Sequence, residues 1–152
     1  MNEFTAKKLG EVQAFARIGL ELAERGCDAF QSALGMEQAQ KFVNDMGALE
    51  SASTNHGTEI TATKAEATTA KLRTMMEQYI GDEWDNPVEL LEWMSFYAGS
   101  GSAHAALVAS AATAGGHTDV ATVASQAKGQ FHDYLHLTVE ALAQVGTEKG
   151  GS

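Results

Sequence analysis

The sequence contains very little cysteine, proline or positive charge. Its 152 residues include one cysteine and one proline, and 20 Asp and Glu residues stand against 10 Lys and Arg residues. A lone cysteine excludes an internal disulfide framework and a zinc site built from Cys-x-x-Cys pairs. The net charge of −10 repels phosphate groups, so we expect neither nucleic acid nor an anionic membrane as a partner.

Long hydrophobic runs are also missing. The longest nearly uncharged stretch, residues 94–114, is long enough to cross a bilayer but consists mostly of Ala, Gly and Ser and contains His104. Such a segment inserts poorly into a membrane. The first residues lack a basic region followed by an apolar run, so no secretory signal is expected. These absences predict a cytoplasmic protein with no membrane-spanning segment.

Alanine is abundant, and apolar residues recur with helical spacing. No stretch of the sequence alternates apolar and polar residues for long enough to predict a strand. Helices are predicted over residues 5–26, 36–53, 58–80, 87–114 and 118–145, with a short helix or turn over 28–34. The clearest start is Asn86-Pro87, a good N-cap followed by the residue type favoured at the first helical position. We therefore predict an all-α fold, an antiparallel four-helix bundle with one or two short extra helices. The predicted domain is 1–146, and 147–152 is a flexible polar tail.

Metal-ligand spacing occurs once, at His132 and His136, with Glu140 one turn further along the same helix. Residues four apart lie on one side of a helix, so two imidazoles and a carboxylate can converge there. This ligand set suits zinc, iron or manganese. The apolar stripe of the same helix points His136 and Glu140 away from the core, so solvent-exposed or interface histidines are the alternative.

His104 shares a helix face with Leu90, Trp93 and Val108, so it is predicted to be buried. Gly99 and Gly101 precede it, and each costs about 1 kcal/mol in a helix relative to alanine. Such a cost indicates either a close approach of another helix or room for a ligand beside His104. A core histidine bonded to a serine or a backbone carbonyl is the simpler interpretation.

Glu11 falls on a secondary apolar flank of the first helix, where an unpaired carboxylate is costly. Three roles are open to it: a metal ligand from across the bundle, an ion pair with Lys7, Lys8 or an imidazole, or a boundary residue that reaches solvent.

Cys27 lies on the core stripe of the first helix and is predicted to be packed rather than nucleophilic. The aromatic cluster of Trp84, Trp93, Phe96 and Tyr97 is predicted to be core and cap packing, and it also suits a dimer seam.

Over roughly residues 4–145 the chain resembles small bacterial ferritin-like four-helix bundles. Two segments carry this resemblance: residues 86–107, which include Trp93 and His104, and Phe131-His132-Asp133-Tyr134-Leu135. Ferritin-like di-iron proteins carry Glu-x-x-His pairs on two helices, and here only Asp133-x-x-His136 comes near. By the resemblance, Glu11 matches the first-helix glutamate. The chain also looks faintly like DinB-type bundles, which implies His132, His136 and either His56 or His104 as ligands.

Two functions follow as hypotheses. One is a non-catalytic helical bundle that self-associates, with a dimer favoured, or binds a protein partner. The alternative is a metal-binding bundle holding iron, manganese or zinc, with Glu11, His104, His132 and His136 as the ligands.

Overall fold

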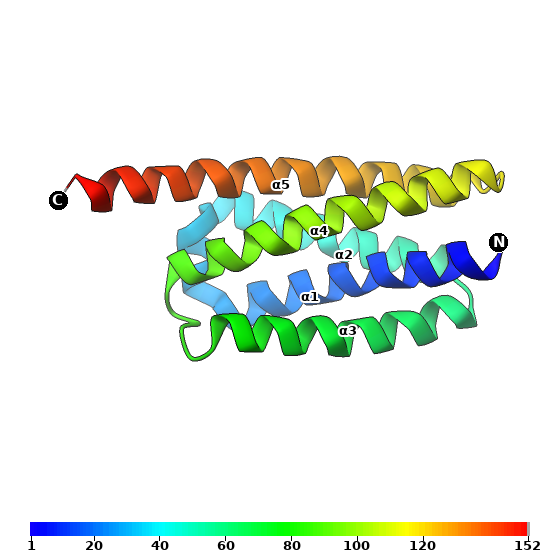
Figure 1. Cartoon of the computed structure of the whole chain (residues 1–152), viewed down its shortest axis with the longest axis horizontal. Coiled ribbons are helices and arrows are strands. Elements are labelled where there is room, and N and C mark those ends of the chain that lie inside the picture. The colour runs from blue at the N-terminus through cyan, green and yellow to red at the C-terminus, as the bar shows by residue number, and fades with distance from the viewer. Residues whose placement is uncertain (152) are drawn as a thin grey trace.

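The computed structural model describes residues 1–151, which are almost entirely helical and include no strand. The helices are α1 (Glu3–Leu34), α2 (Met36–His56), α3 (Glu59–Ile80), α4 (Pro87–Ala114) and α5 (Thr118–Gly150). The predicted all-α fold class is confirmed. Consecutive helices run in opposite directions, so α1, α3 and α5 point one way and α2 and α4 the other (Figure 1).

Most helix boundaries lie close to their predicted positions. Asn86 caps α4 as expected, because its Oδ1 accepts the backbone N–H of Val88 at 3.1 Å. The N-terminal end of α5 differs, since His117 and not Thr118 occupies the position before its first residue. The other end also differs, because α5 continues through Gly150 into the segment predicted as a polar tail.

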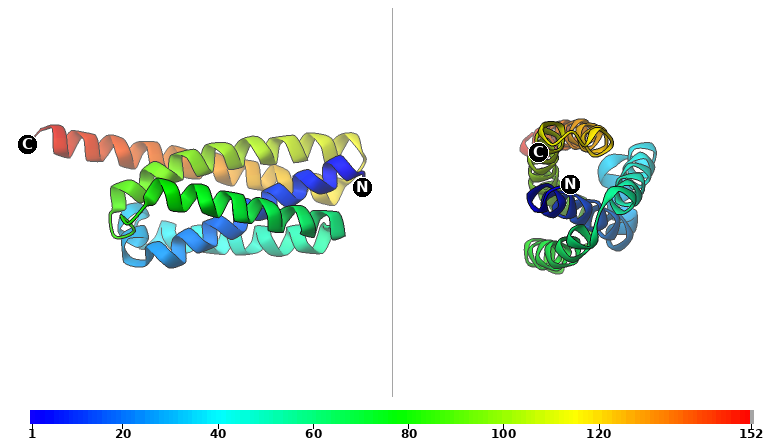
Figure 2. Two further views of the ribbon diagram at one scale, coloured as in Figure 1. Left: turned by 60° about the horizontal axis from the view of Figure 1, so that its bottom comes forward. Right: turned by 90° about the vertical axis from the view of Figure 1, so that its right-hand side faces the viewer.

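Helix α1 lies at the centre of the fold. All eight residues from Leu9 to Ala16 are buried, although only about half of the residues of a surface helix normally face a core. The cause is that α2, α3 and α4 each pack extensively on α1, so no broad face of it is left to solvent. The view along the molecule shows α1 passing between its neighbours (Figure 2).

The remaining contacts are uneven. Helix α4 packs along α5, and α2 makes a smaller contact with α5. Helix α3 packs on α1 and touches α4 over only a short stretch. As a result α3 lies on the outside of α1, and its other faces are largely uncovered (Figures 1 and 2).

Helix α1 is broken at Cys27, whose φ of 41° and ψ of −113° are not helical. The predicted interruption between Gly26 and Asp28 is therefore confirmed. The prediction that Cys27 packs in the core is wrong, because this residue is exposed. The predicted stripe reaches Cys27 through Leu20 and Ala23, which are only half-buried. The buried positions around the break are Leu22, Gly26, Ala29 and Phe30, on another side of the helix.

The two glycines of α4 have different environments. A Cβ on Gly101 would lie 2.8 Å from ring atoms of Phe131 on α5, whereas a Cβ on Gly99 would meet nothing within 4 Å. Of the two explanations raised by the sequence, close helix approach therefore accounts for Gly101. Gly99 has no packing reason of this kind.

Alanine substitutions at these two positions are expected to have opposite effects. Gly101→Ala forces α4 and α5 apart and should lower the free energy of unfolding by roughly 1–3 kcal/mol, as overpacking does. Gly99→Ala adds a better helix former in open space and should raise it by about 0.5–1 kcal/mol. Urea unfolding followed by circular dichroism measures both. Equal effects of the two substitutions would contradict the close α4–α5 approach at Gly101.

Candidate functional site

The structure brings two of the four predicted metal ligands together. His104 Nε2 of α4 lies 3.7 Å from Glu11 Oε2 of α1. His132 and His136 are exposed on α5 and join neither of them. Across residues 1–151, no group of three or more His, Cys, Asp or Glu side chains is placed to hold a metal ion. Metal binding by these four residues stays a prediction, and their arrangement does not favour it.

Glu11 is surrounded by positive charge instead. Only 8% of this residue is exposed. Lys8 Nζ lies 3.1 Å from both carboxylate oxygens, and Lys64 Nζ of α3 lies 3.6 Å from Oε1. Two ammonium groups offset the cost of burying the carboxylate, which is the ion-pair alternative considered from the sequence. This cluster links α1, α3 and α4.

His104 is less buried than predicted, because 35% of its side chain is exposed. Its Nδ1 lies 2.8 Å from the carbonyl oxygen of Ser100, so Nδ1 carries the proton and donates it to that oxygen. One face of the ring packs against Phe15, with ring centroids 5.0 Å apart. Helix α1 therefore covers one side of the His104 ring, through Phe15 and Glu11, and leaves another side open to solvent.

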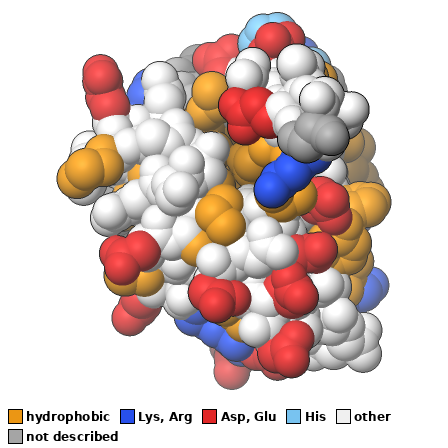
Figure 3. Space-filling model, turned by 90° about the vertical axis from the view of Figure 1, so that its left-hand side faces the viewer, with side chains coloured by type: hydrophobic (Ala, Val, Ile, Leu, Met, Phe, Trp, Pro, Cys, Tyr) orange, Lys and Arg blue, Asp and Glu red, His pale blue; other side chains and the backbone are white. Residues whose placement is uncertain are grey.

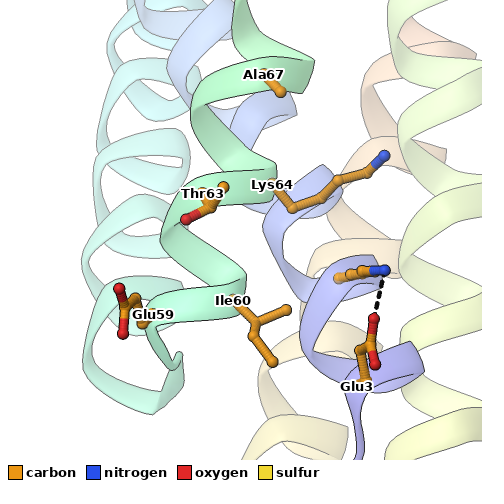
Figure 4. A pocket seen from close by; sticks show the side chains of 7 residues that line it. Glu3, Glu59, Ile60, Thr63, Lys64 and Ala67 are labelled. Atoms are coloured by element: carbon orange, nitrogen blue, oxygen red, sulfur yellow. Dashed lines mark ion pairs between the residues drawn. The ribbon is translucent and has the colours of Figure 1, made fainter.

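A hollow lies between the N-terminal halves of α1 and α3 (Figure 4). Ile60 points from α3 toward α1, and the ion pair between Glu3 and Lys7 closes the opposite side. Lys64, which also lines this hollow, already pairs with Glu11. Three of the four charged groups that line the hollow, Glu3, Lys7 and Lys64, are therefore paired within the chain. Glu59 is the fourth, and it forms no ion pair within residues 1–151.

A second hollow lies where α3 ends and α4 begins. We call it the α3–α4 hollow; its lining residues are Met75, Gln78, Tyr79, Trp93 and Phe96. It is open to solvent and has a volume of about 420 Å³. Tyr79 lies beside both other aromatic rings, with centroids 6.1 Å from Trp93 and 5.2 Å from Phe96.

The walls of the α3–α4 hollow are unusually exposed for apolar side chains. Phe96 is 59% exposed, Met75 48% and Tyr79 39%, and these are three of the eight large hydrophobic residues exposed in the described chain. Trp93 forms the floor and is almost fully buried, and its indole N–H has no hydrogen-bond partner within residues 1–151. The predicted aromatic cluster is therefore divided, because Trp93 and Tyr97 are core residues whereas Phe96 faces solvent.

The α4 side of this hollow carries two carboxylates without cations. Tyr79 Oη donates to Glu92 Oε2 at 3.2 Å. Neither Glu89 nor Glu92 forms an ion pair with a Lys, Arg or His of residues 1–151. The pKa of Tyr79 is raised above its usual value, first by burial and then by the hydrogen bond to Glu92 and the nearby charges of Glu92 and Glu89.

The sequence around the hollow contains no cation to neutralise these groups. Residues 74–127 include no Lys or Arg but seven Asp and Glu residues. A view onto the end of the molecule where α3 meets α4 shows more red acidic side chains than blue basic ones (Figure 3). This gap in the positive charge was visible in the sequence. The exposure of Phe96, which makes this gap relevant to the hollow, is visible only in the structure.

Comparison of the chain with protein-family models, with curated proteins and with solved structures finds no match. Within the described residues, every helix is too short or too polar to cross a membrane.

Proposed function

We propose that the chain is a non-catalytic helical bundle that binds a protein partner through the α3–α4 hollow. In this proposal α1, α2, α4 and α5 form an antiparallel four-helix bundle, and α3 is a fifth helix on the outside of α1. The observation that carries the proposal is the contiguous exposure of Met75, Tyr79 and Phe96. Isolated exposed apolar residues are ordinary, but apolar side chains gathered in one hollow are typical of an interaction surface.

The proposal is tested by placing a photoreactive phenylalanine analogue, benzoylphenylalanine, at Phe96 in the full chain expressed in its native host. Irradiation is expected to give discrete products heavier than the 16.1 kDa chain. Tyr79→Ser in the same chain should reduce their yield several-fold, because it removes one wall of the hollow. Mass spectrometry of the products identifies what is attached.

The matched control places the same analogue at Met36, the first residue of α2, which is apolar and 75% exposed but does not line the hollow. Products that are the same from both positions, or products from Phe96 that do not depend on Tyr79, would contradict docking in the hollow. A product of twice the chain mass would indicate that the hollow binds a second copy.

Self-association is proposed at a different surface, the C-terminal end of α5. This end extends beyond the other helices (Figure 1), and no residue from Val139 to Gly151 is buried. Val139, Leu142 and Val145 nevertheless recur at three-residue spacing, which places them on one side of the helix. A free helix end gains stability by packing, and a second copy of the same end provides such a surface.

The α5 proposal predicts a dimer that depends on this apolar side. Light scattering during size-exclusion chromatography should give twice 16.1 kDa for the unmodified chain and 16.1 kDa for the Val139→Asp/Val145→Asp variant, which spares Leu142 because that residue packs against the chain's own core. The control is Ala143→Asp/Gln144→Asp, which adds the same charge at exposed positions on the same segment. A monomeric unmodified chain would overturn the proposal, as would dissociation by the control variant.

A further inference from the structure

The partner's chemistry, which rests on the proposed function, follows from the residues around the α3–α4 hollow. We infer that the α3–α4 hollow binds a basic amphipathic helix, whose apolar side chains enter the hollow and whose Lys or Arg side chains pair with Glu89 and Glu92.

The shape of the surface favours a helix. The hollow lies between two antiparallel helices, α3 and α4, which meet only over a short stretch. A third helix laid along such a groove places side chains at i, i+3, i+4 and i+7 against both walls. Extended peptides are usually bound by adding a strand to a sheet edge, and residues 1–151 offer no strand.

The charge of the surface favours a basic partner. Elsewhere on α1, α2 and α3, buried or half-buried carboxylates are paired within the chain, as Glu11 is with Lys8, Glu21 with Arg73 and Glu50 with Arg17. Glu89 and Glu92 are half-buried beside the hollow and have no cation within residues 1–151. Desolvating them under an uncharged or acidic partner would be costly, whereas a Lys or Arg from the partner would offset that cost.

The same end of the molecule already accepts one cation on an aromatic ring. The guanidinium of Arg25 lies 3.9 Å from the ring centroid of Trp84, in the segment that joins α3 to α4. Arg25 also pairs with Glu77 of α3. This intramolecular arrangement combines an aromatic ring, a carboxylate and a cation. The hollow presents the rings of Tyr79 and Phe96 beside Glu92 but has no cation of its own.

A second copy of this chain fits the hollow poorly. Two copies facing each other here would bring together surfaces that contain only acidic charges between residues 74 and 127. Like charges across an interface reduce affinity and suppress that pairing.

The experiment titrates the full chain with three synthetic amphipathic peptides by isothermal titration calorimetry at low salt. The peptides share one leucine-rich face and differ only at their polar positions, which are all Lys, all Gln or all Glu. We expect the Lys peptide to bind at least tenfold more tightly than the Gln peptide, and the Glu peptide not to bind. Phe96→Ser should abolish the binding of each peptide that binds to the unmodified chain.

The charge contribution is isolated with a matched pair of variants. Glu89→Gln/Glu92→Gln should lower the affinity for the Lys peptide at least tenfold and leave the affinity for the Gln peptide unchanged. Asp119→Asn/Asp133→Asn removes the same charge from exposed positions on α5 and should have little effect on either peptide. Circular dichroism confirms that each variant keeps its helical content, and both amide substitutions preserve side-chain size.

The outcomes separate the inference from the proposed function. If the Gln peptide binds as tightly as the Lys peptide and both depend on Phe96, the basic partner is wrong and the docking surface stands. If both double variants weaken the Lys peptide equally, the attraction is only that of net charge, and the inference fails. If no peptide binds in a Phe96-dependent way, the hollow does not receive a helix, and the crosslinking from Phe96 decides whether it binds any protein.

Discussion

Gly19→Ala is expected to lower the free energy of unfolding by roughly 2–3 kcal/mol, at the upper end for overpacking of a core. A Cβ on Gly19 would lie 2.3 Å from the hydroxyl oxygen of Tyr97 and 2.9 Å from the ring of Phe42. Tyr97 has little freedom to move, because it is buried and its hydroxyl donates to the carbonyl oxygen of Phe15 at 2.6 Å. Urea unfolding followed by circular dichroism measures the loss.

A double-mutant cycle identifies the atom responsible. Tyr97→Phe alone removes the hydrogen bond to Phe15 and should cost about 1–1.5 kcal/mol. In the Gly19→Ala background, Tyr97→Phe also removes the clash between the new Cβ and the tyrosine hydroxyl. It should therefore cost less stability than in the unmodified chain, or even raise the stability. The expected coupling free energy between the two substitutions is about 1 kcal/mol or more. Gly47→Ala is the control, because a Cβ there meets nothing within 4 Å. A Gly19→Ala chain as stable as Gly47→Ala, or purely additive effects, would contradict the packing described here.

The protein should unfold cooperatively in alkali, and its buried tyrosines should ionise only as it unfolds. The pKa of Tyr97 is raised well above its usual value, chiefly by burial. The pKa of Tyr134 is also raised, first by burial and then by the hydrogen bond that its hydroxyl donates to Asp45 at 2.7 Å. Each group therefore stays protonated in the folded chain at a pH where the unfolded chain has lost the proton.

Alkaline pH destabilises the folded chain, because the unfolded chain loses these two tyrosine protons at a lower pH than the folded chain does. Below about pH 10 both states hold these protons, so the two groups contribute no pH dependence there. Above about pH 10 the unfolded state binds fewer protons, and each tyrosine lowers the free energy of unfolding by about 1.4 kcal/mol per pH unit. Apart from the contribution of the exposed Tyr79, tyrosinate absorbance and helical circular dichroism, recorded together, should change in one transition above about pH 11. Tyrosine titration that is complete while the helical signal persists would contradict the burial of Tyr97 and Tyr134.

Local signals in the sequence predicted most of the secondary structure. The Asn86-Pro87 start of α4 depends on side-chain capping within two residues, and the interruption of α1 follows Gly26. The stripe of α2 is also correct, because Phe42 and Met46 are fully buried. Signals of this kind act over one or two helical turns, so they can be recognised without knowing what the helix packs against.

The position of each helix in the fold could not be predicted in the same way. A helix covered on several sides, as α1 is from Leu9 to Ala16, has no single apolar stripe, so its pattern does not show that it is central. The spacing of Tyr79 and Phe96 is that of core residues. Both are nevertheless exposed, because α3 and α4 contact each other too little to cover them. Of the four proposed metal ligands, Glu11 and His104 lie together, because α1 packs on α4. His132 and His136 are exposed on α5, as the apolar stripe of that helix indicated for His136.

The central position of α1 affects how the protein is made. Helix α1 leaves the ribosome first, but its contacts come from α2, α3 and α4, and the last of these ends only at Ala114. Until then a nascent chain exposes apolar side chains on more than one side of its first helix. Because contacts between elements distant in sequence form late, the core around α1 cannot close until α4 has been synthesised. During synthesis the growing chain therefore depends on its own acidic charge, or on chaperones, to avoid aggregation.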